Sequence, residues 1–376
     1  MKSTILKDAP VTNFLTQTGI FSSSDAVSKV IGFLRDTNSY EAFVQERERT
    51  AILTIRDILN VKDITTTKLS TLMHYVPRLT LKSVIRDAAT IMFRYKIRSL
   101  PVYQNSRFRG VVTAQAILKE LMGSDHNEKI GGLMTPSPIC VDSGDEVAKA
   151  RRIMLKRKID QLPVIKQGRL QGVVTSSSIV FNLIPYADRT VAGGWRSSRF
   201  STPVEDFEPE VATTNLITDT LNGVYENMSK MGTQYSVILN LDEVHGIITL
   251  RDFMRMLVEP ERNDSIPMYI VGLPEDPFEA EATREKFSRV VSFLRKKVPD
   301  MMEARAVIKA GKTKAARTRY EVQVSVTTAR NRYNYTGVGY ELPDVFDEID
   351  QWSKKLLGKT SSTGRRRVRA DPGTIT

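Results

Sequence analysis

The stretch "IRSLPVYQNSRFRGVVT", from Ile97 to Thr113, decides how the first two thirds of the chain are interpreted, because a second stretch repeats it. The second stretch is "IDQLPVIKQGRLQGVVT", from Ile159 to Thr175, and the offset is 62 residues (159 − 97). Both contain "LPV" and "GVVT" in the same register. A repeat with a constant offset indicates one supersecondary unit that is used more than once.

The repeated unit predicts the order strand, helix, strand, strand, helix. A helix with apolar residues on one face, between Val84 and Met92, precedes the strand "SLPVY"; a polar turn, the strand "GVVT" and the helix "AQAILKELM" follow. The two strands are expected in the core, with the glycine making the turn. Weaker copies contain "AILTIRDILN", from Ala51, and "GIITLRDFMRML", from Gly246. We place the four copies at about residues 8–62, 66–123, 129–187 and 199–259.

This pattern resembles the CBS domain, the small βαββα repeat named after cystathionine beta-synthase. CBS repeats work in pairs whose sheets pack face to face. The resemblance therefore implies two modules, at residues 1–125 and 126–262. The expected fold class is α/β for these repeats and α+β for the region that follows them.

The resemblance also implies candidate nucleotide sites. In nucleotide-binding CBS pairs, a Thr after the last strand faces the phosphate at a helix N-terminus, and an Asp three residues later accepts the ribose hydroxyls. The matching residues are Thr54 with Asp57 and Thr249 with Asp252. The other two copies have Ala116 and Ser178 at the Asp position. A T-x-x-D pattern is equally a helix capping box, so both alternatives stay open, with an adenine nucleotide as the candidate ligand.

Composition excludes several classes of function. No apolar run is long enough to span a bilayer, and we read no export signal. Cys140 is the single cysteine and the three histidines are far apart in the sequence, which argues against a disulfide, a zinc site or a Cys–His nucleophile. We therefore expect a cytoplasmic protein that is not an enzyme and holds no metal.

A different pattern occupies residues 266–357. It predicts strands at 268–273, 302–311, 317–328 and 331–340 and helices at 276–298 and 342–357. The third of these strands alternates apolar and polar residues, as a half-buried strand does. The order β-α-β-β-β-α resembles the ribosome hibernation-promoting and ribosome-associated inhibitor domain, and is similar in outline to double-stranded RNA-binding domains.

Positive charge gathers in this last region. From residue 266 onward there are 21 Lys and Arg against 14 Asp and Glu, which leaves +7 of the total +12. A basic surface predicts a polyanion partner, and we favour RNA over a merely solvated surface. The candidate RNA-binding residues are Lys286, Arg289, Lys296, Lys297, Arg305, Lys309, Lys312, Lys314, Arg317, Arg319, Arg330 and Arg332, joined by Arg365, Arg366, Arg367 and Arg369 of a flexible tail at 358–376. Tyr333, Tyr335 and Tyr340 are candidate stacking partners for bases.

The whole arrangement resembles the CBS-bearing ribosome hibernation factors of archaea, the dual ribosomal subunit inhibitor type. That resemblance implies a protein that binds rRNA and blocks the mRNA and tRNA sites during dormancy. The expected partners are the small ribosomal subunit, with the large subunit as a second candidate, and neither membrane nor DNA. The alternative is a regulatory subunit that senses adenine nucleotides and controls an enzyme or a transporter.

Overall fold

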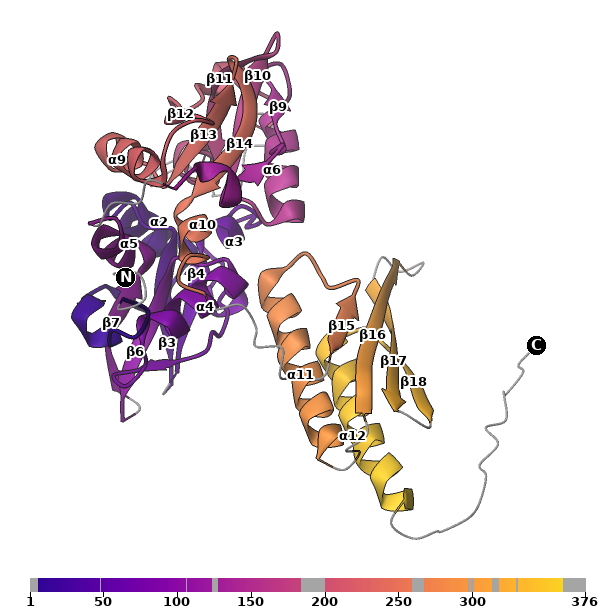
Figure 1. Ribbon diagram of the computed structural model, residues 1–376. Coiled ribbons are helices and arrows are strands. Elements are labelled where there is room, and N and C mark those ends of the chain that lie inside the picture. The colour runs from indigo at the N-terminus through magenta and orange to yellow at the C-terminus, as the bar shows by residue number, and fades with distance from the viewer. Residues whose placement is uncertain are drawn as a thin grey trace. The chain divides into compact units, whose positions relative to one another are not determined.

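The computed structural model describes residues 6–47, 49–105, 107–123, 128–183, 200–258, 267–296, 298, 301–312, 318–328 and 331–360. The chain divides into two compact units, residues 1–260 and 261–376 (Figure 1). No helix within the described ranges combines the length and the apolar character that crossing a lipid bilayer requires.

The N-terminal unit contains four copies of the order strand, helix, strand, strand, helix, which confirms the predicted fold class. The first copy consists of β2 (Ile20–Ser22), α2 (Val27–Asp36), β3 (Glu41–Glu46), β4 (Arg49–Thr54) and α3 (Ile55–Ile58). The second consists of β5 (Leu79–Thr80), α4 (Ile85–Tyr95), β6 (Ser99–Gln104), β7 (Arg107–Thr113) and α5 (Ala114–Leu121). The third consists of β9 (Val141–Asp142), α6 (Val147–Arg157), β10 (Gln161–Lys166), β11 (Arg169–Thr175) and α7 (Ser176–Leu183). The fourth consists of β12 (Thr214–Leu216), α9 (Leu221–Met231), β13 (Tyr235–Asn240), β14 (Glu243–Thr249) and α10 (Leu250–Met254).

Every repeat builds its small sheet in the same way. The first strand runs parallel to the second, and the second and third form an antiparallel hairpin. A parallel neighbour needs a crossover connection, and the first helix of each repeat provides it. Short 3-10 turns precede the repeats: η1 (Val11–Phe14), η2 (Leu69–Thr71), η3 (Ile130–Gly132) and η4 (Glu205–Phe207).

The segment ahead of each repeat is exchanged with the other repeat of its pair. β1 (Leu15–Thr16), ahead of repeat one, pairs with β7 of repeat two, and His74, ahead of β5, bridges back to β4 of repeat one. β8 (Thr135–Pro136), ahead of repeat three, pairs with β14 of repeat four, and Glu210, ahead of β12, bridges back to β11 of repeat three. This exchange ties repeat one to repeat two and repeat three to repeat four.

The glycine of the repeated "GVVT" motif has a different role from the predicted one. It lies inside a strand, where the exchanged segment crosses it, and does not make the turn. A Cβ on Gly110 would lie 2.6 Å from the carbonyl oxygen of Thr16, and a Cβ on Gly172 would lie 2.7 Å from that of Glu210. The repeated glycine therefore permits the close backbone approach on which the exchange depends.

Helices join the two modules. α3 of repeat one packs against α6 and α7 of repeat three, and α10 of repeat four packs against α4 and α5 of repeat two (Figure 1). Ile55 and Ile58 of α3 share a buried apolar cluster with Ile179 and Val180 of α7. Each fully buried side chain of this size stabilises the folded state by about 1.5–3 kcal/mol, so the four repeats form one body.

The C-terminal unit has the predicted order β-α-β-β-β-α. Its elements are β15 (Met268–Val271), α11 (Pro277–Arg295), β16 (Met301–Lys312), β17 (Thr318–Thr328), β18 (Arg332–Gly339) and α12 (Leu342–Thr360). The four strands form one sheet in chain order, with β15 parallel to β16 and the other neighbours antiparallel. Asp276 caps α11 by accepting the backbone N–H groups of Phe278 and Glu279.

Both helices of this unit cover the same face of the sheet (Figure 1). Phe287 of α11 meets Phe346 of α12 edge to face, with the ring centroids 6.1 Å apart. Val322, Val324 and Val326 point from β17 into this core, while Arg319 and Gln323 on the same strand are exposed. The alternation predicted from the sequence is therefore confirmed, and among the described residues of this unit no helix covers the opposite face of the sheet.

Candidate functional site

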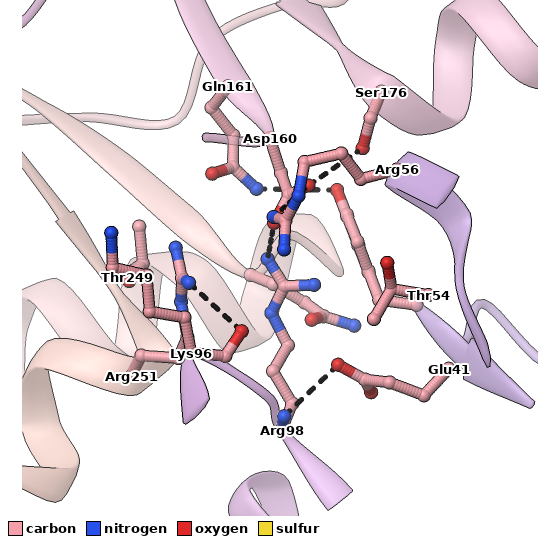
Figure 2. A network of polar contacts seen from close by, with 12 residues as sticks. Glu41, Thr54, Arg56, Lys96, Arg98, Asp160, Gln161, Ser176, Thr249 and Arg251 are labelled. Carbon is pink, nitrogen blue, oxygen red and sulfur yellow. Dashed lines mark hydrogen bonds and ion pairs between the residues drawn. The ribbon is translucent and has the colours of Figure 1, made fainter. Parts of the chain in front are cut away.

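A network of charged side chains lies where the four repeats meet, and each repeat contributes one residue (Figure 2). Arg98 and Asp160 immediately precede the second strand of repeats two and three, 62 residues apart (160 − 98). Arg56 and Arg251 lie in the short second helices of repeats one and four, each two residues after the Thr of the T-x-x-D pattern. Equivalent positions of the repeat thus supply all four charges.

Asp160 is the only acid among these four residues. Its Oδ1 lies 2.9 Å from Nη1 of Arg56, and its Oδ2 lies 3.2 Å from Nη2 of Arg98. The hydroxyl of Ser176 donates a further hydrogen bond of 3.2 Å to Oδ1. Because Asp160 belongs to the second module and both arginines belong to the first, this carboxylate joins the two modules.

Arg98 is held by contacts on several sides. Its guanidinium carbon lies 3.6 Å from the centroid of the Tyr40 ring, a cation–π contact. Its backbone N–H donates to Oε1 of Glu41 over 3.1 Å, and the Ser99 hydroxyl donates to Oε2 of Glu41 over 3.1 Å. The Tyr40 ring and Asp160 therefore hold the guanidinium, while Glu41 holds the backbone at Arg98.

Arg251 completes the network from repeat four. Its Nη1 donates to the carbonyl oxygen of Lys96 over 3.1 Å (Figure 2). Its Nε atom and the Nε atom of Arg98 are buried, and neither has a hydrogen-bond partner among the described residues. Two donors in one network are therefore left available for an acceptor.

The pKa values follow from burial and from neighbouring charges. Burial alone raises the pKa of Asp160, but Arg56, Arg98 and Arg251 outweigh it and lower that pKa to about 2. Burial lowers the pKa of Arg251 to about 10, so its guanidinium remains charged at pH 7. Burial raises the pKa of Glu41. The three guanidinium groups and the Asp160 carboxylate sum to +2, and the neighbouring carboxyl groups of Asp252 and Glu41 offset part of this positive charge.

Both predicted T-x-x-D pairs form capping boxes. The backbone N–H and the hydroxyl of Thr54 donate to Oδ2 of Asp57 over 2.8 and 2.6 Å, and those of Thr249 donate to Oδ2 of Asp252 over 2.8 Å each. Asp57 differs because its Oδ1 also lies 3.2 Å from Nε2 of His74. α3 has four residues and α10 five, so the helix dipole at these N-termini is small. Nucleotide binding at these residues remains a prediction.

Repeats two and three, which have no Asp in this pattern, have a simpler cap at the corresponding helix. Thr113 caps α5 by accepting the N–H of Ala116 over 3.1 Å. Thr175 accepts the N–H of Ser178 over 2.9 Å and donates its hydroxyl to Oε1 of Glu210 over 2.7 Å. In repeat three, the Thr175 hydroxyl therefore already bonds to Glu210 and is not free to bond to a phosphate.

The predicted RNA-binding residues of the C-terminal unit fall into three groups. Arg305, Lys309, Arg319 and Arg332 are exposed on the three long strands, and none of them forms an ion pair within the described part of the chain. Their side chains share the uncovered face, because the alternate residues of the same strands form the core. Arg289 is exposed on α11, which covers the other face, and Lys296 is exposed directly after the end of this helix.

One of the remaining predicted residues bonds within the domain, and the side chains of the others are not described. Lys286 bonds within the domain: its Nζ donates to the carbonyl oxygen of Pro343 over 2.9 Å and lies 2.6 Å from Oδ1 of Asp347. Only the backbone of Lys312 is described. Outside the described residues lie Lys297, Lys314, Arg317, Arg330, Arg365, Arg366, Arg367 and Arg369. The described basic residues therefore lie on both faces of the domain, and RNA binding by them stays a prediction.

The structure also corrects the predicted stacking residues. Tyr333 and Tyr335 pack against the apolar core on the covered face, and the Tyr335 ring lies 5.2 Å from that of Trp352. They are therefore unavailable to bases. Tyr340 is 56% exposed at the end of β18, and Tyr269 of β15, which the sequence analysis missed, is 52% exposed. The sequence did contain a signal for this residue, because Tyr269 lies in the stretch "MYIV", which was predicted as a strand.

Comparisons with known proteins agree with the N-terminal fold. The profile of the CBS domain matches residues 61–123 and 130–184. An uncharacterized protein of Methanocaldococcus jannaschii, MJ1404, is 21% identical over 296 residues, which cover 74% of this chain and 69% of that protein. The crystal structure of protein MJ1225 from the same organism aligns with a TM-score of 0.59 and 17% identity, covering 66% of this chain and 99% of that one.

A third similarity is shorter. Inosine-5'-monophosphate dehydrogenase of Staphylococcus saprophyticus is 28% identical over 105 residues, which are 27% of this chain but 21% of the dehydrogenase. The chain thus contains CBS domains in a mixed α/β fold. Its repeats resemble those of archaeal CBS proteins whose function is uncharacterized.

Proposed function

We propose that this protein is a non-enzymatic, ribosome-binding regulator that silences translation by occupying the mRNA and tRNA sites. The observation that carries the proposal is the uncovered sheet face of the C-terminal unit, where Arg305, Lys309, Arg319 and Arg332 are exposed. The order β-α-β-β-β-α of this unit is that of the hibernation domain which it resembles. The proposed partners are rRNA and the small subunit, with the large subunit as a second candidate, in the cytoplasm.

Phosphate contacts would supply most of the affinity. Each Lys or Arg that meets a phosphate releases condensed counterions, so binding weakens steeply as the salt concentration rises. The four residues lie on adjacent strands, and neighbouring strands are about 4.8 Å apart, so they present charge over a surface rather than at one point. The N-terminal unit would add a second contact with the ribosome, which raises the apparent affinity through effective concentration.

Co-sedimentation with purified ribosomes in sucrose gradients tests this proposal. We expect the intact chain to travel with ribosomal particles in low salt, and the combined change of Arg305, Lys309, Arg319 and Arg332 to Gln to abolish co-sedimentation. A charge-matched control changes four exposed basic residues of the N-terminal unit to Gln: Lys119, Arg152, Lys156 and Arg169. If the sheet variant still co-sediments like the control, the proposal is wrong.

A second candidate function rests on the charge network of the N-terminal unit. CBS domains commonly bind adenine nucleotides in regulatory roles. The excess positive charge around Asp160 and the buried Nε atoms of Arg98 and Arg251 would suit the phosphates of such a ligand. On this view the protein senses adenine nucleotides and controls an enzyme or a transporter, or the nucleotide switches ribosome binding.

Two measurements separate these functions. If a nucleotide site exists, calorimetric titration with ATP and AMP should show binding to the wild type that Asp252→Ala abolishes. Asp57→Ala should have less effect, because Oδ1 of Asp57 already contacts His74. Ribosome binding that survives Asp57→Ala with Asp252→Ala supports the first function. Nucleotide binding without any co-sedimentation supports the second.

A further inference from the structure

The uncovered sheet face carries more than positive charge. The register places Tyr269 of β15 beside Arg305 of β16, Arg305 beside Ser325 of β17, and Ser325 beside Asn334 of β18. Residues paired in this way point to the same side of a sheet, so the four side chains form one row across it. We call Tyr269, Arg305, Ser325 and Asn334 the tyrosine row.

The next row has two apolar and two polar residues. Val271 is paired with Val307, Val307 with Gln323, and Gln323 with Thr336. Val271 is 45% exposed, and Val307 is half-buried. A surface that binds only phosphates gains nothing from an exposed tyrosine and two valines, whereas the flat faces of unpaired bases do.

Acidic residues on the same face argue against a duplex. Glu303 lies on the row before the tyrosine row, paired with Thr327, and Glu321 is paired with Lys309 two rows beyond it. A double-stranded RNA hides its bases, so it cannot use Tyr269 and the valines, and its two rows of phosphates would meet these carboxylates as well as the basic residues. A single strand can lay its bases on Tyr269 and the valines and direct its phosphates to Arg305 and Lys309.

We infer that this face binds single-stranded RNA, with one unpaired base stacked on Tyr269 and the adjoining phosphate held by Arg305. The amide and hydroxyl groups of Asn334, Gln323 and Ser325 can meet base edges or ribose hydroxyls. This inference rests on the proposed function and narrows it to the class of RNA that is bound.

Fluorescence anisotropy on the full-length protein tests the inference, with a labelled 20-nucleotide single-stranded RNA and a 20-base-pair RNA duplex as probes. We expect the single strand to bind at least tenfold more tightly. Stacking of one base predicts that Tyr269→Ala weakens single-strand binding by about 5- to 100-fold. Tyr269→Phe should bind like the wild type, because the ring is retained.

The dependence on salt distinguishes stacking from charge. Tyr269→Ala should leave the slope of log affinity against log salt unchanged, whereas Arg305→Gln should reduce it by about 0.7, the value for one phosphate of a single strand. Tyr75→Ala is the control, since Tyr75 is 46% exposed in the N-terminal unit.

Two results would overturn the inference: equal affinity for the duplex and the single strand, or a Tyr269→Ala variant that binds like Tyr75→Ala. Either result leaves the proposed function standing if the variant with Arg305, Lys309, Arg319 and Arg332 changed to Gln still loses co-sedimentation with ribosomes. If that variant also keeps co-sedimentation, the proposed function fails as well. The readouts therefore separate the two failures.

Discussion

Replacing Asp160 with Asn removes the carboxylate of the central network while keeping its size and shape. Arg56 and Arg98 then lose their ion pairs of 2.9 and 3.2 Å. Asp160 and Arg98 are 3% and 6% exposed, so water cannot replace the lost charge. Three guanidinium groups remain close together after the carboxylate that bonds two of them is lost, and we expect Asp160→Asn to destabilise the N-terminal unit.

Two routes give the magnitude. Removing one partner of a buried ion pair costs about 3–5 kcal/mol, since the other charge stays buried. The pKa of Asp160 falls from an ordinary 3.8 to about 2, and at about 1.4 kcal/mol per pH unit that difference corresponds to roughly 2–3 kcal/mol. Both routes therefore predict a loss of about 3 kcal/mol in the free energy of unfolding at pH 7.

The pH dependence has a definite sign. A carboxyl group whose pKa is lower in the folded state stabilises that state when it is ionised. The contribution of Asp160 is therefore complete above pH 4 and is lost as the pH falls from about 4 to about 2. The wild type and Asp160→Asn should converge in stability over that range.

Urea denaturation of the full-length protein, followed by circular dichroism at pH 7, measures the loss. Hydrogen exchange read by mass spectrometry then shows whether it falls on peptides from residues 6–258 and spares those from 267–360. Glu205→Gln is the matched control, because it breaks the ion pair of 2.7 Å with Lys166, whose side chains are 43% and 50% exposed. An exposed pair is worth less than about 1 kcal/mol. If Asp160→Asn costs no more than this control, the argument from buried charge is refuted.

Three further changes test other parts of the structure. Burial raises the pKa of Glu210, so the ionised carboxylate destabilises the folded state. Glu210→Gln should therefore raise the urea midpoint at pH 7 but not at pH 4. An equal gain at both pH values would contradict the raised pKa. Gly272 has φ +81°, and a Cβ there would lie 2.1 Å from the carbonyl oxygen of Ile308. Gly272→Ala should therefore lower the free energy of unfolding, measured by thermal denaturation, by at least about 2 kcal/mol. Gly311→Ala is the control and should change little, because no atom lies within 4 Å of a Cβ at that position. Asp276→Ala removes the acceptor of two N–H groups at the start of α11 and should cost about 1 kcal/mol; an unchanged melting temperature would show that the cap contributes nothing.

The fold could be predicted where the sequence has a period. The offset of 62 residues predicted repeats two and three, and the alternation in 317–328 predicted the covered and uncovered sides of β17. The role of the repeated glycine could not be predicted in this way. Gly110 is explained by Thr16, which is 94 residues earlier in the chain (110 − 16), and no local pattern indicates that contact.

The candidate sites were predicted only in part for the same reason. The T-x-x-D pattern identified Thr54 and Thr249 and left helix capping open as an alternative, but no local pattern indicates that His74 also contacts Asp57. Charge alone identified Arg289 and Arg305 together, although α11 and the uncovered sheet face lie on opposite sides of the domain. Whether charges meet is decided by which face an element buries, and this depends on tertiary packing.

The central network suggests why the two modules of one chain pair with each other. Arg98 and Asp160 occupy equivalent positions of their repeats and carry opposite charges. If module one packed in the same way against a second copy of itself, Arg98 would face another Arg98 with no carboxylate between them, and two copies of module two would bring Asp160 against Asp160. Like charges at a buried interface cost several kcal/mol, so both homotypic pairings are disfavoured. Pairing of module one with module two places Asp160 against both Arg56 and Arg98, so the divergence at this repeated position favours the heterotypic pairing that the chain forms within itself.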